Sequence, residues 1–119
     1  MCETVSGDRA YLQFYLSNFT DTRSLSNAIR NISYCNESTN TAGALRLTRT
    51  EIFVTANGDR SGVPNVIVLL TDGNPTGETD FLSGEVDLIK NLGVRIIGIG
   101  VTNQVSYCST NILLSTRNA

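Results

Sequence analysis

The sequence predicts a single α/β domain built on a mainly parallel sheet. Two apolar runs, Val66–Leu70 and Val94–Val101, are continuous in the way that buried parallel strands are. The segment Phe81–Leu92 lies between them, and its apolar residues recur at helical spacing. A strand, a helix and a strand at these distances form a βαβ unit, whose two strands run parallel.

Two further elements are expected at the start of the chain. Tyr11–Leu16 reads YLQFYL, and its aromatic and apolar residues predict a strand. Thr20–Thr22 follows and offers polar side chains that can cap a helix. The apolar residues after this cap share one face of the expected helix: Leu25, Ala28, Ile29 and Ile32.

A second helix is expected to begin near Thr41, after the polar loop Cys35–Asn40. Its stripe consists of Ala44, Leu45, Thr48 and Ile52, and Phe53 widens it. The segment Ala56–Gly62 contains an Asn-Gly pair and predicts a loop.

Within the βαβ unit, both apolar runs are expected to be buried on both faces of the sheet. The helix between them presents one apolar face and is expected to stop at Gly93, since glycine is favoured just after a helix. That face consists of Leu82, Val86, Ile89 and Leu92. The segment 106–118, SYCSTNILLSTRN, predicts the start of one more helix.

Composition excludes several classes of function. The chain has 119 residues, of which 40% are hydrophobic, which suits one globular domain. Its net charge is −2, with one lysine and scattered arginines, so a nucleic-acid surface is not expected. No apolar run reaches membrane-spanning length, and Met1–Thr4 does not begin a signal peptide. Histidine is absent, which excludes a Ser-His-Asp triad and a zinc site containing histidine.

The candidate site centres on Asp72, which directly follows the strand Val66–Leu70 and Thr71. Ligands of parallel sheets bind at the carboxyl ends of the strands. A carboxylate there, with the hydroxyls of Thr71 and Thr76 nearby, suits Mg²⁺, Ca²⁺ or Mn²⁺. The alternative is that Asp72 only caps its loop, as in an Asx-turn. Neither a phosphate-binding loop nor a complete dinucleotide fingerprint accompanies it.

The cysteines and asparagines bear on the cellular compartment. Cys2, Cys35 and Cys108 form no CxxC motif, so they can be three buried thiols. Three acceptor triplets for N-glycosylation favour an extracellular origin instead, and they begin at Asn18, Asn31 and Asn36.

Three stretches in order make the chain resemble a von Willebrand factor A-type domain, closest in character to those of collagen VI and matrilins. They are STNTAGAL at 38–45, VIVLLTDGNPT at 66–76 and GVRIIGIGVTN at 93–103. The resemblance covers nearly the whole chain. It implies a Rossmann-like open sheet with flanking helices and a metal-ion-dependent adhesion site for Mg²⁺ or Ca²⁺. Carried over by motif, the ligands in this chain are Thr39 and Asp72.

The chain departs from this family in one motif and at both ends. The family's DxSxS ligand motif is absent, and Met1–Val5 resembles the middle of its second strand. We therefore expect residues 1–119 to be a single partial domain that lacks the first strand and helix and the last elements. One hydroxyl and one carboxylate are few ligands for a hard cation, so weak cation binding or none is expected from this chain.

The function implied by the resemblance is a non-enzymatic, extracellular adhesion or matrix-interaction module. Its expected partners are matrix proteins such as collagens, or cell-surface receptors, and neither nucleic acid nor membrane insertion is expected. The resemblance further implies that Cys35 and Cys108 lie near the metal-site face, where they can form a disulfide. The alternative is an intracellular metal-dependent α/β enzyme or nucleotide-binding domain that uses Asp72.

Overall fold

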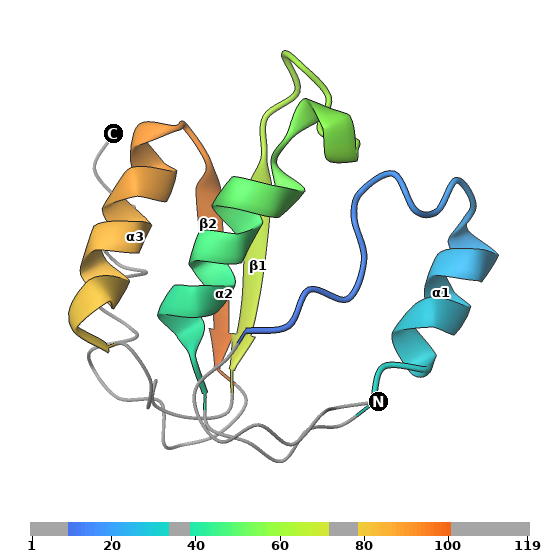
Figure 1. The fold of residues 1–119 in the computed structure, drawn as a ribbon, viewed down its shortest axis with the longest axis horizontal. Coiled ribbons are helices and arrows are strands. Elements are labelled where there is room, and N and C mark those ends of the chain that lie inside the picture. The colour runs from blue at the N-terminus through green and yellow to red at the C-terminus, as the bar shows by residue number, and fades with distance from the viewer. Residues whose placement is uncertain (1–9, 34–38, 72–78, 101–119) are drawn as a thin grey trace.

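The computed structural model of the chain describes residues 10–33, 39–71 and 79–100 (Figure 1). Several predictions lie outside these residues and are not tested by the structure. They are the roles of Asp72 and Thr76, the Cys35–Cys108 disulfide, the place of Cys2, the acceptor Asn36 and the helix expected within 106–118.

The βαβ unit has the predicted form. Strand β1 (Val66–Thr71) and strand β2 (Arg95–Gly100) pair in parallel, in a register that runs from Val66 opposite Arg95 to Thr71 opposite Gly100. Helix α3 (Thr79–Asn91) connects them. The fold is therefore α/β with a parallel sheet flanked by helices, as predicted.

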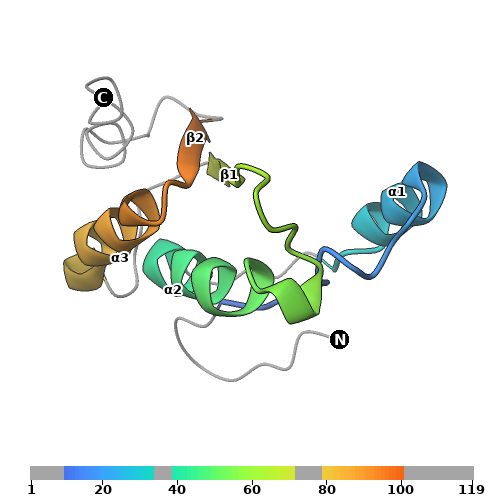
Figure 2. The same ribbon diagram turned by 90° about the horizontal axis from the view of Figure 1, so that it is seen from above.

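The core lies between one face of this strand pair and the helices α2 (Thr41–Leu47) and α3 (Figure 2). Phe53 and Ile67 pack against it from the side. Because apolar burial is the main favourable term in folding, this one-sided layer holds the described parts of the sheet and helices together. Its buried residues are Ala42, Leu45, Leu82, Val86, Ile89, Val94 and Ile96.

The end of α3 follows the prediction except at one residue. Gly93 has a φ of 77°, and its N–H donates to the Lys90 carbonyl at 2.8 Å, which closes the helix. Leu92 was expected on the buried face but is exposed. The helix ends at Asn91, so Leu92 no longer follows the helical period of Leu82 and Ile89.

The strands are not buried on both faces, and that prediction is wrong. Burial alternates along β1, where Val66, Val68 and Leu70 are exposed, and along β2, where Ile97 and Ile99 are exposed. The helices α2 and α3 cover only one face of the pair, and α1 (Thr22–Arg30) stands to one side of it (Figure 2). Side chains that alternate to the other face therefore remain in contact with solvent.

The stripe predicted for the second helix divides between two sides. Ala42 and Leu45 are buried against α3 and the sheet, whereas Ala44 and Ile52 line a groove beside the N-terminal segment. The five residues that directly follow α2, Thr48–Ile52 (η1), form a π-helix. In it the Phe53 N–H donates to the Thr48 carbonyl at 2.9 Å. The wider turn changes the period of the helix, which a stripe drawn at constant spacing does not anticipate.

The N-terminal segment was expected to contain a strand, and this prediction is also wrong. Residues 10–14 alternate between half-buried and exposed as a strand does, but they join no ladder with the other described residues. Phe14 instead contacts Phe19 edge to face, with ring centroids 5.2 Å apart. An extended segment becomes a strand only when a neighbouring strand accepts its hydrogen bonds, and β1 and β2 pair only with each other among the described residues.

Helix α1 begins at the predicted cap. The Asp21 carboxylate accepts hydrogen bonds from the Ser24 N–H at 2.9 Å and the Ser24 hydroxyl at 2.7 Å. Its predicted apolar face is nevertheless not part of the core, since Ile29 and Ile32 are exposed and no residue of α1 is buried.

A glycine turn connects the N-terminal segment to the rest of the molecule. The predicted Ala56–Gly62 loop contains a short 3-10 helix, Thr55–Asn57 (η2), that ends at Gly58 with a φ of 102°. The Ser17 N–H donates to the Asn57 carbonyl at 3.1 Å. A Cβ on Gly58 would lie 2.5 Å from the Ser17 nitrogen, so only glycine permits this approach.

We expect Gly58→Ala to destabilise the protein by about 2–3 kcal/mol and to increase hydrogen exchange at the Ser17 amide. A left-handed backbone costs an alanine about 1–2 kcal/mol, and the contact with Ser17 adds to that cost. Gly62→Ala is the matched control, because Gly62 also has a positive φ, 79°, but no neighbour within 4 Å of the added carbon. Equal losses in urea unfolding for the two variants would show that the contact with Ser17 contributes nothing.

Candidate functional site

The candidate site is the edge of the sheet at which the strands end. The carboxyl ends of β1 and β2, the first turn of α2 and the start of α3 all lie at the lower edge in Figure 1. Ligands of parallel α/β sheets bind at this edge, since the loops that follow the strands open there. The start of α2, which follows Thr39 and Asn40, and the end of β1, which precedes Asp72, therefore lie at this edge.

Thr39 is half-buried immediately before α2. The next residue, Asn40, caps the helix: its Oδ1 accepts from the Gly43 N–H at 2.6 Å, and its carbonyl accepts from the Ala44 N–H at 3.1 Å. An added Cβ on Gly43 would lie 2.9 Å from the Asn40 side chain, so the tight cap depends on this glycine. The cap therefore orients the loop that carries Thr39.

Asp72 follows Thr71, the last residue of β1, and lies outside the described residues. The structure thus places the strand end that precedes Asp72 and the start of α2 that follows Thr39 at one edge of the sheet. The pairing of Thr39 with Asp72 stays a prediction.

The described residues alone do not fit a resident metal ion. Over residues 10–33, 39–71 and 79–100 there is no group of three or more His, Cys, Asp or Glu side chains that could hold one. At the sheet edge the predicted ligand among them is the hydroxyl of Thr39. A hard divalent cation takes six or more oxygen ligands, several of them carboxylates, so this set is too small.

Two of the three predicted glycosylation sites are accessible. Asn18 is exposed in a turn, where its Oδ1 accepts a hydrogen bond from the Tyr15 N–H. Asn31 is exposed at the C-cap of α1. Neither acceptor belongs to the core cluster between α2, α3 and the sheet, and α1 stands apart from that cluster (Figure 1).

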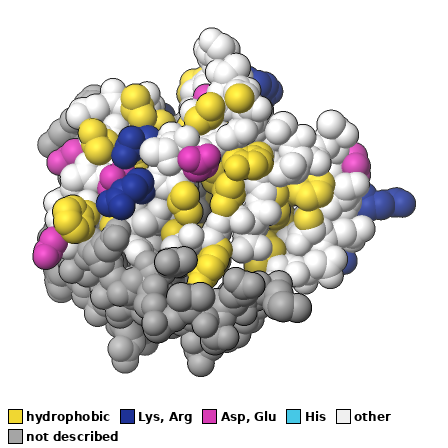
Figure 3. Space-filling model, in the orientation of Figure 1, with side chains coloured by type: hydrophobic (Ala, Val, Ile, Leu, Met, Phe, Trp, Pro, Cys, Tyr) yellow, Lys and Arg dark blue, Asp and Glu magenta, His cyan; other side chains and the backbone are white. Residues whose placement is uncertain are grey.

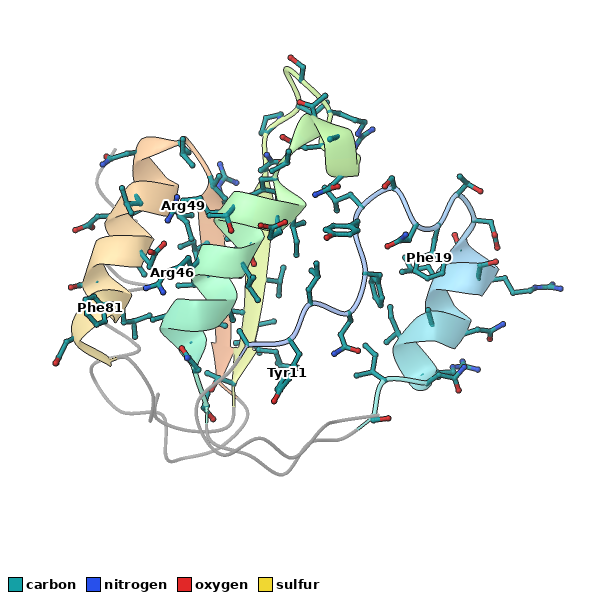
Figure 4. All side chains as sticks on the ribbon, viewed as in Figure 1. Tyr11, Phe19, Arg46, Arg49 and Phe81 are labelled. Atoms are coloured by element: carbon teal, nitrogen blue, oxygen red, sulfur yellow. The ribbon has the colours of Figure 1, made fainter. Side chains whose placement is uncertain are left out.

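One charged cluster was not predicted from the sequence. Glu85 of α3 is only 7% exposed, and its carboxylate accepts from Arg46 Nε at 3.1 Å and from Arg49 Nη2 at 3.0 Å (Figure 4). Arg46 lies on α2 and Arg49 on the adjacent η1, whereas Glu85 lies on α3. The cluster therefore joins α2 and η1 to a helix that is far from them in the sequence. The available signal was a carboxylate between Leu82 and Val86 on an apolar helix face, which requires a cationic partner.

The two arginines decide the ionisation of this carboxylate. Burial by itself opposes the charged form of Glu85, but hydrogen bonds from Arg46 and Arg49 and their positive charges outweigh it, so the pKa of Glu85 is lowered. Glu85 is therefore ionised in the folded protein at neutral pH. Both arginines donate hydrogen bonds to this carboxylate. The cluster is therefore a structural contact between helices, and Glu85 is not available as a general acid.

A groove of about 350 Å³ separates α2 from the N-terminal segment, and hydrophobic side chains are visible on this face of the molecule (Figure 3). None of the described residues that line it is charged. It is lined by Ala10, Tyr11, Leu12, Gln13, Phe14, Ile32, Asn40, Ala44, Leu47, Thr48 and Ile52.

None of the helices formed by the described residues is long and apolar enough to span a membrane.

Comparison with known families matches residues 4–118 to the von Willebrand factor type A domain. Among curated proteins, Matrilin-1 from Gallus gallus is 32% identical over 78% of this chain. Vitrin from Homo sapiens is 34% identical over 80% of it. The chain spans only 18% and 14% of the length of these two relatives.

Solved structures show the same fold. Proximal thread matrix protein 1 from the mussel byssus, with a zinc-occupied MIDAS motif, superposes with a TM-score of 0.74 at 28% identity. The match covers 89% of this chain and 26% of that one. A second crystal form of the same protein gives a TM-score of 0.72 at 27% identity.

We expect Glu85→Gln to lower the free energy of unfolding at pH 7 by about 2 kcal/mol, since the arginines lose a buried charged acceptor. The pKa of Glu85 is lower folded than unfolded, so its contribution is present above the unfolded value, about 4.3, and is lost as pH falls through the folded value. Stability of the wild type should therefore fall more steeply below pH 5 than that of the variant.

Thermal unfolding followed between about pH 3 and pH 7 measures this difference, over the range in which carboxylates titrate. Asp87→Asn is the matched control, because Asp87 is an exposed carboxylate on the same helix. If Glu85→Gln and Asp87→Asn behave alike, the cluster does not hold α2 on α3.

Proposed function

This chain belongs to the von Willebrand factor type A domain family, and on that premise we propose that it is a non-enzymatic, extracellular matrix-interaction module. The observation that carries the proposal is the shared edge of the sheet. There, the capped loop of Thr39 opens beside the end of β1 that leads to Asp72 (Figure 1). Partner proteins would bind at this edge.

The relatives support a role in the matrix. They include Matrilin-1 and Vitrin, and the structural neighbour is a matrix protein of the byssal thread. That neighbour holds zinc in its MIDAS motif, so divalent metal binding occurs within the family. The expected partners of this chain are matrix proteins such as collagens, or cell-surface receptors.

The proposal includes only weak binding of a metal ion, because the set of ligands in this chain is incomplete. Thr39 and Asp72 would contribute one hydroxyl and one carboxylate to Mg²⁺ or Ca²⁺, and the remaining ligands would have to come from elsewhere. In this chain the two residues are proposed to bind a cation weakly and to face the partner. A bound cation would supply positive charge for an acidic group of that partner.

The proposal is tested by binding of the chain to immobilised collagen and other matrix proteins. We expect Thr39→Ala and Asp72→Ala to weaken that binding about tenfold, which corresponds to 1.4 kcal/mol, because both side chains are proposed to contact the partner. Asp87→Ala, an exposed carboxylate on α3, is the control and should bind as the wild type does. Calorimetric titration with Mg²⁺ should give a dissociation constant weaker than about 10⁻⁴ M.

Two results would contradict the proposal in different ways. Matrix binding that is unchanged in both edge variants would show that partners bind elsewhere. A micromolar Mg²⁺ affinity that disappears in Asp72→Ala would show that the chain holds a complete cation site after all.

The glycosylation sites have their own test. Fused to a secretion signal and expressed in eukaryotic cells, the chain should carry N-glycans at the exposed Asn18 and Asn31. Asn18→Gln and Asn31→Gln should each remove one glycan, as measured by mass before and after enzymatic deglycosylation. Asn27→Gln is the control, because Asn27 is exposed on α1 but lies outside any acceptor triplet. Secreted protein without glycans would contradict the assignment.

A further inference from the structure

Asn57 and Gly58 form the Asn-Gly pair of the chain, and they lie in the turn that connects the N-terminal segment to the rest of the molecule. Asparagine is a thermolabile residue, and it deamidates most readily before glycine, because glycine has no side chain to shield its own nitrogen. The pair is therefore a candidate site of a chemical modification that needs no enzyme.

In deamidation the Gly58 nitrogen attacks Cγ, the side-chain carbonyl carbon of Asn57. A bond forms between that nitrogen and Cγ, the Cγ–Nδ2 bond breaks, and Nδ2 leaves as ammonia with the proton lost by the Gly58 amide. Water then opens the resulting succinimide ring at either of its carbonyl carbons. One opening gives aspartate with a normal backbone, and the other gives isoaspartate, whose main chain runs through Cβ and Cγ. The net reaction consumes water, releases ammonia and leaves a carboxylate in place of the amide.

The folded turn holds both reacting groups in hydrogen bonds. Asn57 is half-buried, and its Nδ2, the leaving nitrogen, donates to the Glu51 carbonyl at 2.6 Å. The Gly58 N–H, the attacking group, donates to the Thr55 carbonyl at 3.2 Å. Asn57 is also the last residue of η2, and the ψ of a 3-10 helix, about −20 to −30°, turns the next nitrogen away from the side chain. The attack therefore requires that the turn first opens.

Neither product can rebuild these contacts. Aspartate has an acceptor oxygen in place of Nδ2, so an acceptor would face the Glu51 carbonyl oxygen. Isoaspartate adds a carbon to the main chain and displaces the carbonyl that accepts the Ser17 N–H at 3.1 Å. Among the backbone hydrogen bonds between described residues, this is the one that joins residues 10–33 to residues 39–71. Both products therefore weaken the attachment of the N-terminal segment.

We propose that Asn57 is a site of spontaneous deamidation that the folded turn keeps unreactive, and that its modification irreversibly releases the N-terminal segment from the turn. This inference goes beyond the proposed function and does not rest on it, because it uses neither the edge of the sheet nor a partner. Local segments open reversibly, with free energies at or below that of global unfolding. Deamidation is not reversed, so the modified form accumulates with the age of the molecule.

Peptide mapping by mass spectrometry on the full chain, incubated at neutral pH, measures deamidation at Asn57. In guanidinium chloride, where the turn is unfolded, the rate should be at least about tenfold higher than in the folded protein. Below the unfolding transition the rate should rise with denaturant in parallel with hydrogen exchange at the Gly58 amide, since both report the same opening. Equal rates in the folded and unfolded chain would show that the turn does not protect Asn57. An unfolded chain that does not deamidate there would show that Asn57 is not a site.

Asn57→Asp reproduces one product and tests the release of the N-terminal segment. Hydrogen exchange at the Ser17 amide should increase at least about fivefold, because an acceptor would face an acceptor within the turn. Asn27→Asp is the matched control, since Asn27 is exposed on α1 and the same charge is added there. If circular dichroism shows that Asn57→Asp is unfolded, the deamidated fraction of aged wild type, isolated by ion exchange, gives the same comparison. Exchange at Ser17 that matches the unmodified protein would overturn the release.

Discussion

The packing of α2 and α3 onto a single face of the β1–β2 pair is the contact on which the other features of the structure depend. Parallel strands cannot be joined by a tight turn, so the connecting helix α3 must lie against the sheet that it helps to form. Ile89 and Ala42 are fully buried where the two helices meet the strands. The position of the strand ends, and therefore of the site, follows from this layer.

Charge adds direction to this apolar contact. Hydrophobic burial does not specify how two helices are rotated against each other, since it is roughly proportional to area and has no preferred angle. The carboxylate of Glu85 accepts hydrogen bonds from two arginines, which favours the rotation of α2 and η1 that brings both guanidinium groups toward α3. The capped start of α2 lies at the carboxyl edge of the sheet (Figure 1).

The structure separates two surfaces with different properties. The carboxyl edge is where β1 ends and α2 begins, next to the residues that we propose for partner binding. The face of the sheet that points away from α2 and α3 is aliphatic and lacks a covering helix among the described residues (Figure 2). Both surfaces result from the way the helices cover the strand pair. The strands end at one edge of the sheet, and the side chains that point away from the helices form its uncovered face.

The sequence by itself determined the elements whose evidence is local. The apolar runs and the helical stripe predicted β1, α3 and β2 with their parallel pairing, Asp21 predicted the start of α1, and Gly93 predicted the end of α3. Three ordered motifs predicted the family. Each of these signals lies within a few residues of the feature that it specifies, so no knowledge of distant contacts was required.

Only the tertiary structure decided which of these faces are covered. Val68 and Ile97 have the composition of a buried strand, yet no described element lies over them. Residues 10–14 alternate as a strand does but have no described strand to pair with, and Glu85 is ionised in an apolar stripe because two arginines reach it from elsewhere in the chain. The physical reason is common to all three: burial, ladder pairing and ionisation depend on which other segment lies alongside, and local sequence patterns do not encode that neighbour.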